Sequence, residues 1–395
     1  MPDPITALEA IERARKIVPR VAATSARSEE LRRLDDDAVA ALREQRLASL
    51  LTPRRFGGFE LSPRAHLLAV AELGHGCSAA SWVLMVCGAH TYVAGRFPEP
   101  CQQEVFGPDP DVLIAGTLSP QGVVRATDGG WVLNGRWQFG SGCDHAPWLL
   151  IGARVHEPKP GAWKHYHVIV PTREIALDDT WHTLGMRGTG SKDLVAKDVF
   201  VPAHRATPTR PSFIGDCPQA SSALYRLPVL GALSSMVAAS VLGIAERGFE
   251  QFARRARERR DPLGGTKAEN PVVQARFSES RAELQAARLL LVNLCDRFEE
   301  VMKADAGPLP VEKRLELRAD AAYVVELCQR ALARLFAAAG AHAIYDEPSE
   351  LQRIHRDLGT ATHHAIVDYD SISQLAGAVT LGLDVGEDPL GFPFA

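Results

Sequence analysis

Residues 135–148 read Gly135-Arg136-Trp137-Gln138-Phe139-Gly140-Ser141-Gly142-Cys143-Asp144-His145-Ala146-Pro147-Trp148, and this stretch is the most informative part of the chain. It follows an alternating segment, Trp131-Val132-Leu133-Asn134, whose period of two predicts a β-strand. The loop then places small residues and one hydroxyl group between aromatic side chains. Because Gly140 and Gly142 carry no side chain, a flat aromatic ligand could approach the backbone closely. The stretch therefore predicts a ligand-binding loop at the end of a strand.

The composition is that of an ordinary globular protein. The chain has 395 residues, of which 46% are hydrophobic and 23% charged, so it can bury a sizeable core. Its net charge of −4 gives no reason to expect nucleic acid or an anionic membrane surface as a partner.

The cysteines and the N-terminus predict the compartment. The seven cysteines are scattered, are odd in number and form no CxxC pair, which predicts reduced thiols and no metal site. The first 20 residues lack the apolar core of a signal peptide, and no apolar run reaches membrane-spanning length. We therefore expect a soluble protein of the cytoplasm.

Three zones differ in their hydrophobic patterning. Residues 1–110 have the pattern of helices, for example over 35–51 and 63–97, and residues 111–210 change to the period of two that is typical of strands. Residues 211–395 contain four long apolar-striped segments with short links, which predict a four-helix bundle. These segments are residues 227–258, 272–305, 311–339 and 350–381.

This order of an N-terminal helical domain, a central β-barrel-like domain and a C-terminal four-helix bundle resembles the acyl-CoA dehydrogenase architecture, an α+β fold. The resemblance covers nearly the whole chain. Within that superfamily the motifs resemble the flavin-dependent monooxygenases that form the oxygenase components of two-component hydroxylases. The matching motifs are Ser81-Trp82 through Gly88-Ala89-His90, the loop from Trp137 to Trp148, the run from Trp181 to Asp193, and Arg356-Asp357 followed by His364.

One residue that an acyl-CoA dehydrogenase needs is missing. Such an enzyme requires a carboxylate that removes a proton beside the thioester carbonyl. In the dehydrogenases this base usually lies about nine residues after an Arg-Asp pair, and the corresponding residue here is Ala365. The other known location is the first bundle helix, yet no Asp or Glu occurs between Asp216 and Glu246. Dehydrogenation would require a base from an unexpected position.

The resemblance implies three catalytic residues. His364 lies eight residues after Arg356 and would supply a cation or a hydrogen-bond donor beside the flavin, whereas His363 is left unassigned. Ser141 would lie near the flavin N5; the alternative is a turn serine that bonds its local backbone. His90 would face the substrate and favour the phenolate form of a phenol; the alternative is a buried core histidine.

Further residues are expected around the flavin and the substrate. Trp137 and Phe139 would form a wall for the isoalloxazine ring or pack the β domain. His145 would contact the flavin or the substrate, or lie on the loop surface. His165 and His167 share a strand face and are expected at the surface. The remaining expected cofactor contacts are Thr117, Ser119, Ser141, Thr189 and Ser191.

The resemblance implies a monooxygenase that uses a C4a-(hydro)peroxyflavin to hydroxylate a small aromatic or other electron-rich molecule. No NAD(P)H fingerprint is visible, so a separate NAD(P)H:flavin reductase would supply reduced flavin, with FMN favoured and FAD as the alternative. A homotetramer is also implied. The alternatives are an acyl-CoA dehydrogenase, an N- or S-oxygenase of the same fold, and a non-catalytic scaffold.

Overall fold

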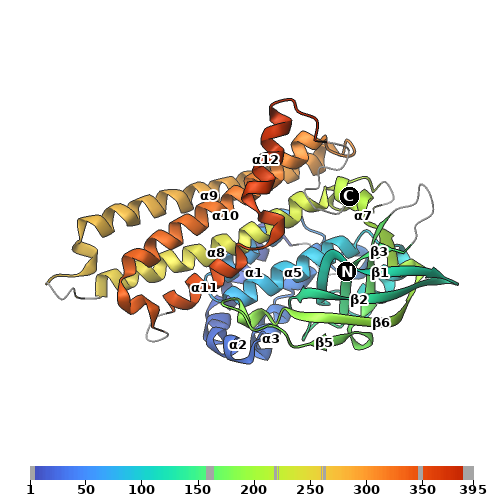
Figure 1. Ribbon diagram of the computed structural model, residues 1–395, viewed down its shortest axis with the longest axis horizontal. Coiled ribbons are helices and arrows are strands. Elements are labelled where there is room, and N and C mark those ends of the chain that lie inside the picture. Colours follow the sequence, from blue (N-terminus) through green and yellow to red (C-terminus); the bar gives the residue numbers. More distant parts are fainter. Residues whose placement is uncertain are drawn as a thin grey trace.

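The computed structural model describes residues 5–156, 164–217, 220, 222–258, 260, 264–345 and 350–385. Its elements follow the order of helices, strands and helices, which confirms the predicted α+β class. Figure 1 shows the strands at one end of an elongated bundle, with the N-terminal helices packed along the bundle.

The N-terminal part is built from short helices. The sequence predicted one helix over 63–97, but the chain breaks before Cys77, whose extended backbone and sulfur cap a new helix. A Cβ at Gly76 would lie 2.6 Å from the Val18 carbonyl oxygen, so the break allows close packing of the first helix. The helices are α1 (Ala7–Ala23), α2 (Ser25–Leu31), α3 (Asp36–Glu44), η1 (Leu47–Leu51), η2 (Arg54–Phe56), α4 (Pro63–Gly74), α5 (Ser78–Ala94) and α6 (Glu99–Phe106).

Strands of the central part form one sheet of seven within the described residues, in the order β5-β6-β2-β1-β3-β4-β7. Strands β1 and β3 pair in parallel, and the other neighbouring strands pair antiparallel. The first strand was not predicted, because its register with β3 shifts between Thr117 and Gly122 and interrupts the alternation. The strands are β1 (Ile114–Thr127), β2 (Gly130–Gly140), β3 (Trp148–Val155), β4 (His165–Pro171), β5 (Ala176–Asp178), β6 (Lys192–Pro202) and β7 (Ala206–Pro208).

The fourth predicted bundle helix is broken, and this corrects the sequence analysis. The side chain of His364 accepts a hydrogen bond from the Ile366 amide at 3.2 Å, and Asp368 accepts one from the Ser371 amide at 2.9 Å, starting the next helix. The break therefore exposes His364 between two helices. The bundle helices are α8 (Val229–Glu258), α9 (Pro271–Ala304), α10 (Val311–Ala339), α11 (Leu351–Ala361), η9 (Ala365–Val367) and α12 (Tyr369–Thr380).

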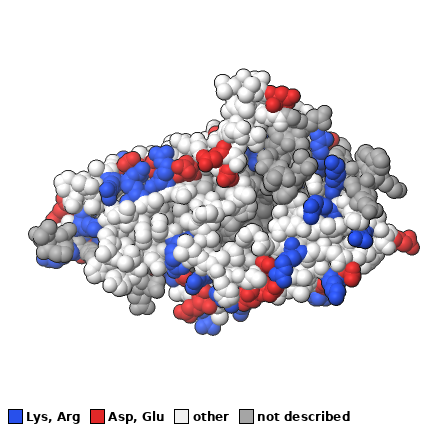
Figure 2. Space-filling model, viewed as in Figure 1, with Lys and Arg blue, Asp and Glu red and all other residues white. Residues whose placement is uncertain are grey.

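Among the described helices, α8 alone is long and apolar enough to cross a membrane. One 18-residue window has a mean hydropathy of 1.7, so the expectation that no apolar run reaches membrane-spanning length is wrong by length and composition. However, 94% of that window is buried inside the protein, which is the environment of a core helix. On the face shown in Figure 2, acidic and basic side chains lie interspersed and do not gather by sign.

Two histidines are buried in the core. His66 of α4 is 0% exposed and packs against Gly88, where a Cβ would lie 2.0 Å from the imidazole ring. His167 of β4 is also 0% exposed and meets Phe213, in helix α7 (Thr209–Ile214), edge to face at 5.5 Å between ring centroids. The expectation that His167 lies at the surface is therefore wrong. Desolvation lowers the pKa of His66 to about 4 and that of His167 to about 3.

These histidines predict a loss of stability in acid. The unfolded chain takes up their protons below a pH of about 6.5, whereas the folded chain resists protonation until near pH 4, so stability falls across this window as the pH falls. At pH 5 the cost is about 2 kcal/mol for each histidine. His167→Leu should lose about 2 kcal/mol less than the wild type between pH 7.5 and 5, measured by urea unfolding. Equal losses in both proteins would contradict this, and the exposed His342→Leu serves as the control.

Candidate active site

Trp82 of α5 joins two of the predicted site residues. Its indole N–H donates a hydrogen bond to the Ser141 hydroxyl oxygen at 3.2 Å. Its ring centroid also lies 5.9 Å from that of His364. Helix α5, the loop after β2 and the break in the bundle therefore meet around one indole ring. Figure 1 shows α5 between the bundle and the sheet, which is the position that allows this junction.

Ser141 lies in a tightly folded loop. Phe139 and Gly142 have positive φ angles of 69° and 76°, and the Gly142 amide donates to the Thr189 carbonyl at 2.9 Å. A Cβ at Gly142 would lie 3.2 Å from Val83 of α5, so a glycine suits both the backbone and the packing. Ser141 is 4% exposed. The loop holds this hydroxyl group against α5 with little freedom.

The Ser141 hydroxyl group begins a chain of hydroxyl groups. Its oxygen lies 2.6 Å from that of Ser191, which lies 2.6 Å from that of Thr189. The Thr189 hydroxyl group then donates to the Met186 carbonyl at 2.8 Å. Thr189 and Ser191 are 1% and 3% exposed. Their hydroxyl groups are thus engaged inside the protein, and direct contact with the flavin stays a prediction for both residues.

His364 carries a hydrogen-bond donor at its free nitrogen. Its Nδ1 accepts the Ile366 amide hydrogen, so in the neutral ring the proton resides on Nε2. His364 is exposed at the surface of the single chain, and desolvation by the surrounding protein lowers its pKa to about 4. At neutral pH the group is a neutral donor, so of the two predicted options the cation is disfavoured. His363, by contrast, bonds the Gly359 carbonyl of its own helix at 2.6 Å.

His90 has the opposite tautomer. Its Nδ1 lies 3.1 Å from the Ile114 carbonyl oxygen, which only accepts, so Nδ1 carries the hydrogen and Nε2 carries a lone pair. Burial lowers the pKa of His90 to about 4, which keeps the ring neutral at physiological pH. His90 lies eight residues after Trp82 on α5, about 12 Å along the helix axis. One helix therefore carries both an acceptor and the indole that touches Ser141.

Three further predicted residues have side chains that are at least partly exposed and that a ligand could contact. Thr117 and Ser119 are half-buried on β1, next to Gly116, whose φ of 125° and close approach to the Leu150 carbonyl require a glycine. Phe139 is 57% exposed and meets Trp181 edge to face at 6.1 Å. All three remain candidates for contact with a planar cofactor.

Trp137 is a core residue of the sheet. It is 0% exposed, its indole donates to the Gly152 carbonyl at 2.7 Å, and its ring fills the space where Gly122 would carry a side chain. Of the two predicted roles, the position fits packing of the β domain. Trp137 is therefore not among the residues that we assign to the flavin.

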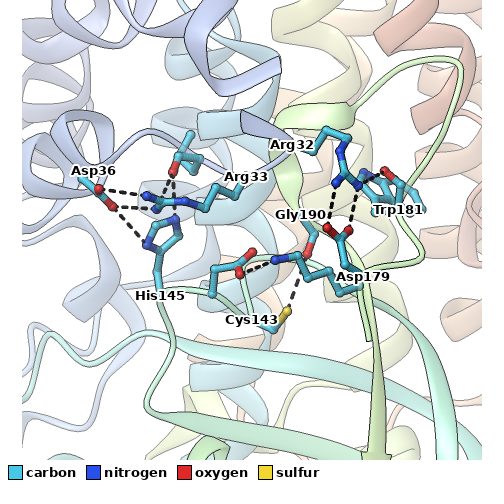
Figure 3. Close-up of polar contacts among 11 residues, drawn as sticks. Arg32, Arg33, Asp36, Cys143, His145, Asp179, Trp181 and Gly190 are labelled. Atoms are coloured by element: carbon cyan, nitrogen blue, oxygen red, sulfur yellow. Dashed lines mark hydrogen bonds and ion pairs between the residues drawn. The ribbon is translucent and has the colours of Figure 1, made fainter. Parts of the chain in front are cut away.

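His145 makes a structural contact between the loop after β2 and the N-terminal helices. Its Nε2 donates to the Leu34 carbonyl at 2.8 Å, which ties the loop after β2 to the start of α3. Figure 3 shows His145 pointing toward Asp36 and away from Cys143. Nearby, Lys192 pairs with Asp144 at 2.5 Å. These contacts fix the loop to the N-terminal helices and leave no free donor on His145 for a ligand.

Two buried carboxyl groups near α5 accept hydrogen bonds from backbone amides. Asp357 of α11 accepts the Met186 amide at 2.6 Å, and Asp111 accepts the Ser49 amide at 3.0 Å. Ala365, at the usual position of a dehydrogenase base, lies exposed in η9 beside His364. Among the residues that the structure describes, the junction around Trp82 thus presents His364 and hydroxyl groups, with no carboxylate bonded to them.

Comparison with known proteins agrees with this arrangement. The acyl-CoA dehydrogenase N-terminal domain family matches residues 8–108, and the acyl-CoA dehydrogenase C-terminal domain family matches residues 235–369. The fold and these two matches thus define a member of the acyl-CoA dehydrogenase superfamily.

Individual relatives narrow the class. The chain is 30% identical to the flavin-dependent monooxygenase oxygenase subunit HsaA of Mycobacterium tuberculosis, over 94% of this chain and 95% of the relative. It is 31% identical to the oxygenase component of the FADH2-dependent resorcinol hydroxylase of a Rhizobium species, over 90% of both chains. The structure of XiaF from a Streptomyces species, in complex with FADH2 and glycerol, superposes with a TM-score of 0.89 at 30% identity, covering 96% of both chains. The chain belongs to the family of oxygenase subunits of flavin-dependent monooxygenases.

Proposed function

We propose that the protein binds reduced flavin supplied by a separate NAD(P)H:flavin reductase and inserts one atom of dioxygen into a small aromatic substrate, with a phenol as the favoured class. The observation that carries the proposal is the junction at Trp82, where Ser141 and the neutral donor His364 stand in place of a carboxylate. The resorcinol hydroxylase relative supports the phenolic class.

The residues of the junction suit a flavin. Gly142 brings the loop backbone close to α5, Phe139 offers an exposed aromatic face, and Thr117 and Ser119 offer half-buried hydroxyl groups. When bound, reduced flavin supplies the two electrons with which dioxygen becomes an oxygen donor. The protein supplies a largely desolvated environment, since Ser141 and His90 are only 4% and 5% exposed.

Each polar residue of the site then has a defined task. Ser141 holds the hydrogen of the flavin N5, and the Nε2 hydrogen of His364 stabilises negative charge on reduced dioxygen. The Nε2 lone pair of His90 accepts the hydrogen of the substrate hydroxyl group and raises electron density on the ring carbon. An acceptor at this place favours a phenol over a sulfide, which has no hydrogen to donate and would undergo S-oxygenation.

The flavin form and the assembly complete the proposal. Two of the three relatives described above name FADH2, so FAD stands beside the FMN that the family resemblance favours. A homotetramer is the assembly that the family resemblance implies. All seven cysteines are free and buried, which supports a reducing, cytoplasmic environment.

The proposal is tested by reconstitution with a flavin reductase. The chain is mixed with NADH, an unrelated reductase, FMN or FAD, isotopically labelled dioxygen and a panel of phenols headed by resorcinol. We expect a hydroxylated product with one labelled oxygen atom, and no NADH oxidation by the chain alone. Oxidation of an acyl-CoA with an electron acceptor, without uptake of dioxygen, would instead indicate a dehydrogenase. Failure to bind any flavin would indicate a non-catalytic role.

A further inference from the structure

We propose that Ser191 and Thr189 are positioning residues that fix the direction of the Ser141 hydroxyl group, so that the site prefers reduced flavin to oxidised flavin. The inference rests on the proposed function, because it takes Ser141 to face the flavin N5. It is carried by the chain of hydrogen bonds that runs from Trp82 to Met186.

The direction of the chain follows from counting hydrogens. Each hydroxyl group has one hydrogen to donate and can accept two. The Met186 carbonyl only accepts, so it takes the Thr189 hydrogen. Thr189 must then accept from Ser191, and Ser191 must accept from Ser141. The hydrogens therefore all point away from the flavin side of the chain.

Ser141 is left as an acceptor at its outer side. Its own hydrogen points to Ser191, and one of its lone pairs accepts the indole N–H of Trp82. The second lone pair is free. The reversed order, with Thr189 donating to Ser191 and Ser191 to Ser141, would free the Ser141 hydrogen but lose the bond from Thr189 to the carbonyl. The forward order has one more hydrogen bond inside the protein and is therefore favoured.

The carbonyl that ends the chain is firmly held. Met186 has a left-handed φ of 55°, and its amide donates to the Asp357 carboxylate at 2.6 Å. The indole of Trp181 also donates to the Met186 carbonyl at 3.0 Å. Asp357 belongs to α11, so the bundle fixes the far end of a hydroxyl chain whose near end is Ser141. This gives Asp357 a function in fixing the far end of the hydroxyl chain.

The redox state of flavin changes what its N5 requires. In reduced flavin N5 carries a hydrogen and needs an acceptor, whereas in oxidised flavin it carries a lone pair and needs a donor. An acceptor-oriented Ser141 forms a hydrogen bond with the reduced form and sets two lone pairs against each other in the oxidised form. Thr189 and Ser191 thus select the flavin form that the reductase delivers.

The test compares dissociation constants for oxidised and dithionite-reduced flavin, with FMN and FAD as probes under anaerobic conditions. Thr189→Val keeps the shape but removes the hydroxyl group, so Ser191 turns to Ser141 and frees the Ser141 hydrogen. We expect the preference for reduced flavin to fall about tenfold, which lowers the two-electron potential of bound flavin by about 30 mV. Thr189→Ser restores the hydroxyl group and should retain the preference.

A matched variant separates this effect from a general loss of packing. Thr172→Val removes another hydroxyl bond to a carbonyl, that of Ala146, outside the chain, and should leave the preference unchanged. Ser191→Ala offers a second break of the chain if Thr189→Val does not fold, and it should also reduce the preference. An unchanged preference in a folded Thr189→Val or Ser191→Ala overturns the inference while the proposed function stands. A wild type that binds neither flavin form overturns the proposed function itself.

Discussion

Replacing His90 with asparagine is expected to lower the turnover of a phenolic substrate about a hundredfold while leaving flavin binding intact. The asparagine amide can still donate to the Ile114 carbonyl, as Nδ1 of His90 does at 3.1 Å. It has no atom at the position of Nε2, so the acceptor for the substrate hydroxyl group is lost. The variant thus separates the structural bond of His90 from its proposed chemical task.

The size of the effect follows from the pKa of His90. Burial lowers this pKa to about 4, so the ring is neutral and its lone pair is available near pH 7. The same shift makes His90 a weak base, far below a phenol with a pKa of about 10. His90 therefore polarises the substrate O–H bond and does not hold the proton before the reaction. This places the expected loss at the lower end of the range for general base catalysis.

A matched substitution tests the assignment. Glutamine places its amide oxygen near the position of Nε2, so His90→Gln should lose only about tenfold in turnover. Activity of His90→Asn should recover as the pH rises toward 10, because the phenol then ionises without help. These values are measured as kcat and KM with resorcinol in the reconstituted system, with flavin binding as the control. Wild-type turnover in His90→Asn would contradict the assignment, and so would a loss in His90→Gln that is larger than the loss in His90→Asn.

Much of the fold could be predicted from the sequence, because strong periodicity fixes long elements. The predicted helix 311–339 and the predicted strand 148–155 coincide with α10 and β3. The prediction of one continuous helix over 350–381 was wrong. The apolar stripe runs on through residues that form a turn, because local capping by side chains ends one helix and starts the next. Asp368, whose side chain accepts a hydrogen bond from the Ser371 amide, is a residue type that commonly begins a helix. The long apolar stripe nevertheless favoured one uninterrupted helix in the sequence-based prediction.

The residues of the site were predicted less well than the fold. The resemblance pointed to Ser141, His90 and His364, and the structure brings Ser141 and His364 together at Trp82. The sequence alone could not show that His145 bonds the Leu34 carbonyl, because that contact joins residues 111 positions apart.

The hydroxyl chain was missed for a similar reason. Thr189 and Ser191 were predicted as possible flavin contacts because their loop resembles the one that closes the flavin site in the family. Which hydroxyl group faces a ligand and which faces another hydroxyl group depends on side-chain directions that one sequence does not fix.

Replacing Ser141 with alanine is expected to divert most of the oxygen reaction from hydroxylated product to hydrogen peroxide. The substitution removes the oxygen atom that holds the N5 hydrogen, and the loss of one placed hydrogen-bonding group in an active site costs about a hundredfold. It also leaves the buried indole N–H of Trp82 without its partner at 3.2 Å. We therefore expect hydroxylated product per NADH to fall at least about tenfold, with a matching rise in peroxide.

The measurement and its control decide whether Ser141 acts through chemistry or through packing. Product and peroxide are quantified together in the reconstituted system with resorcinol, so a shift between them is visible even when total oxygen uptake is unchanged. Ser49→Ala is the matched control, since Ser49 is fully buried and donates to the Arg46 carbonyl at 2.9 Å, away from the hydroxyl chain. A packing defect would lower both outputs. A Ser141→Ala protein that couples oxygen to product as well as the wild type does would show that the reaction does not need this hydroxyl group, and would leave His364 as the residue beside Trp82 that stabilises reduced dioxygen.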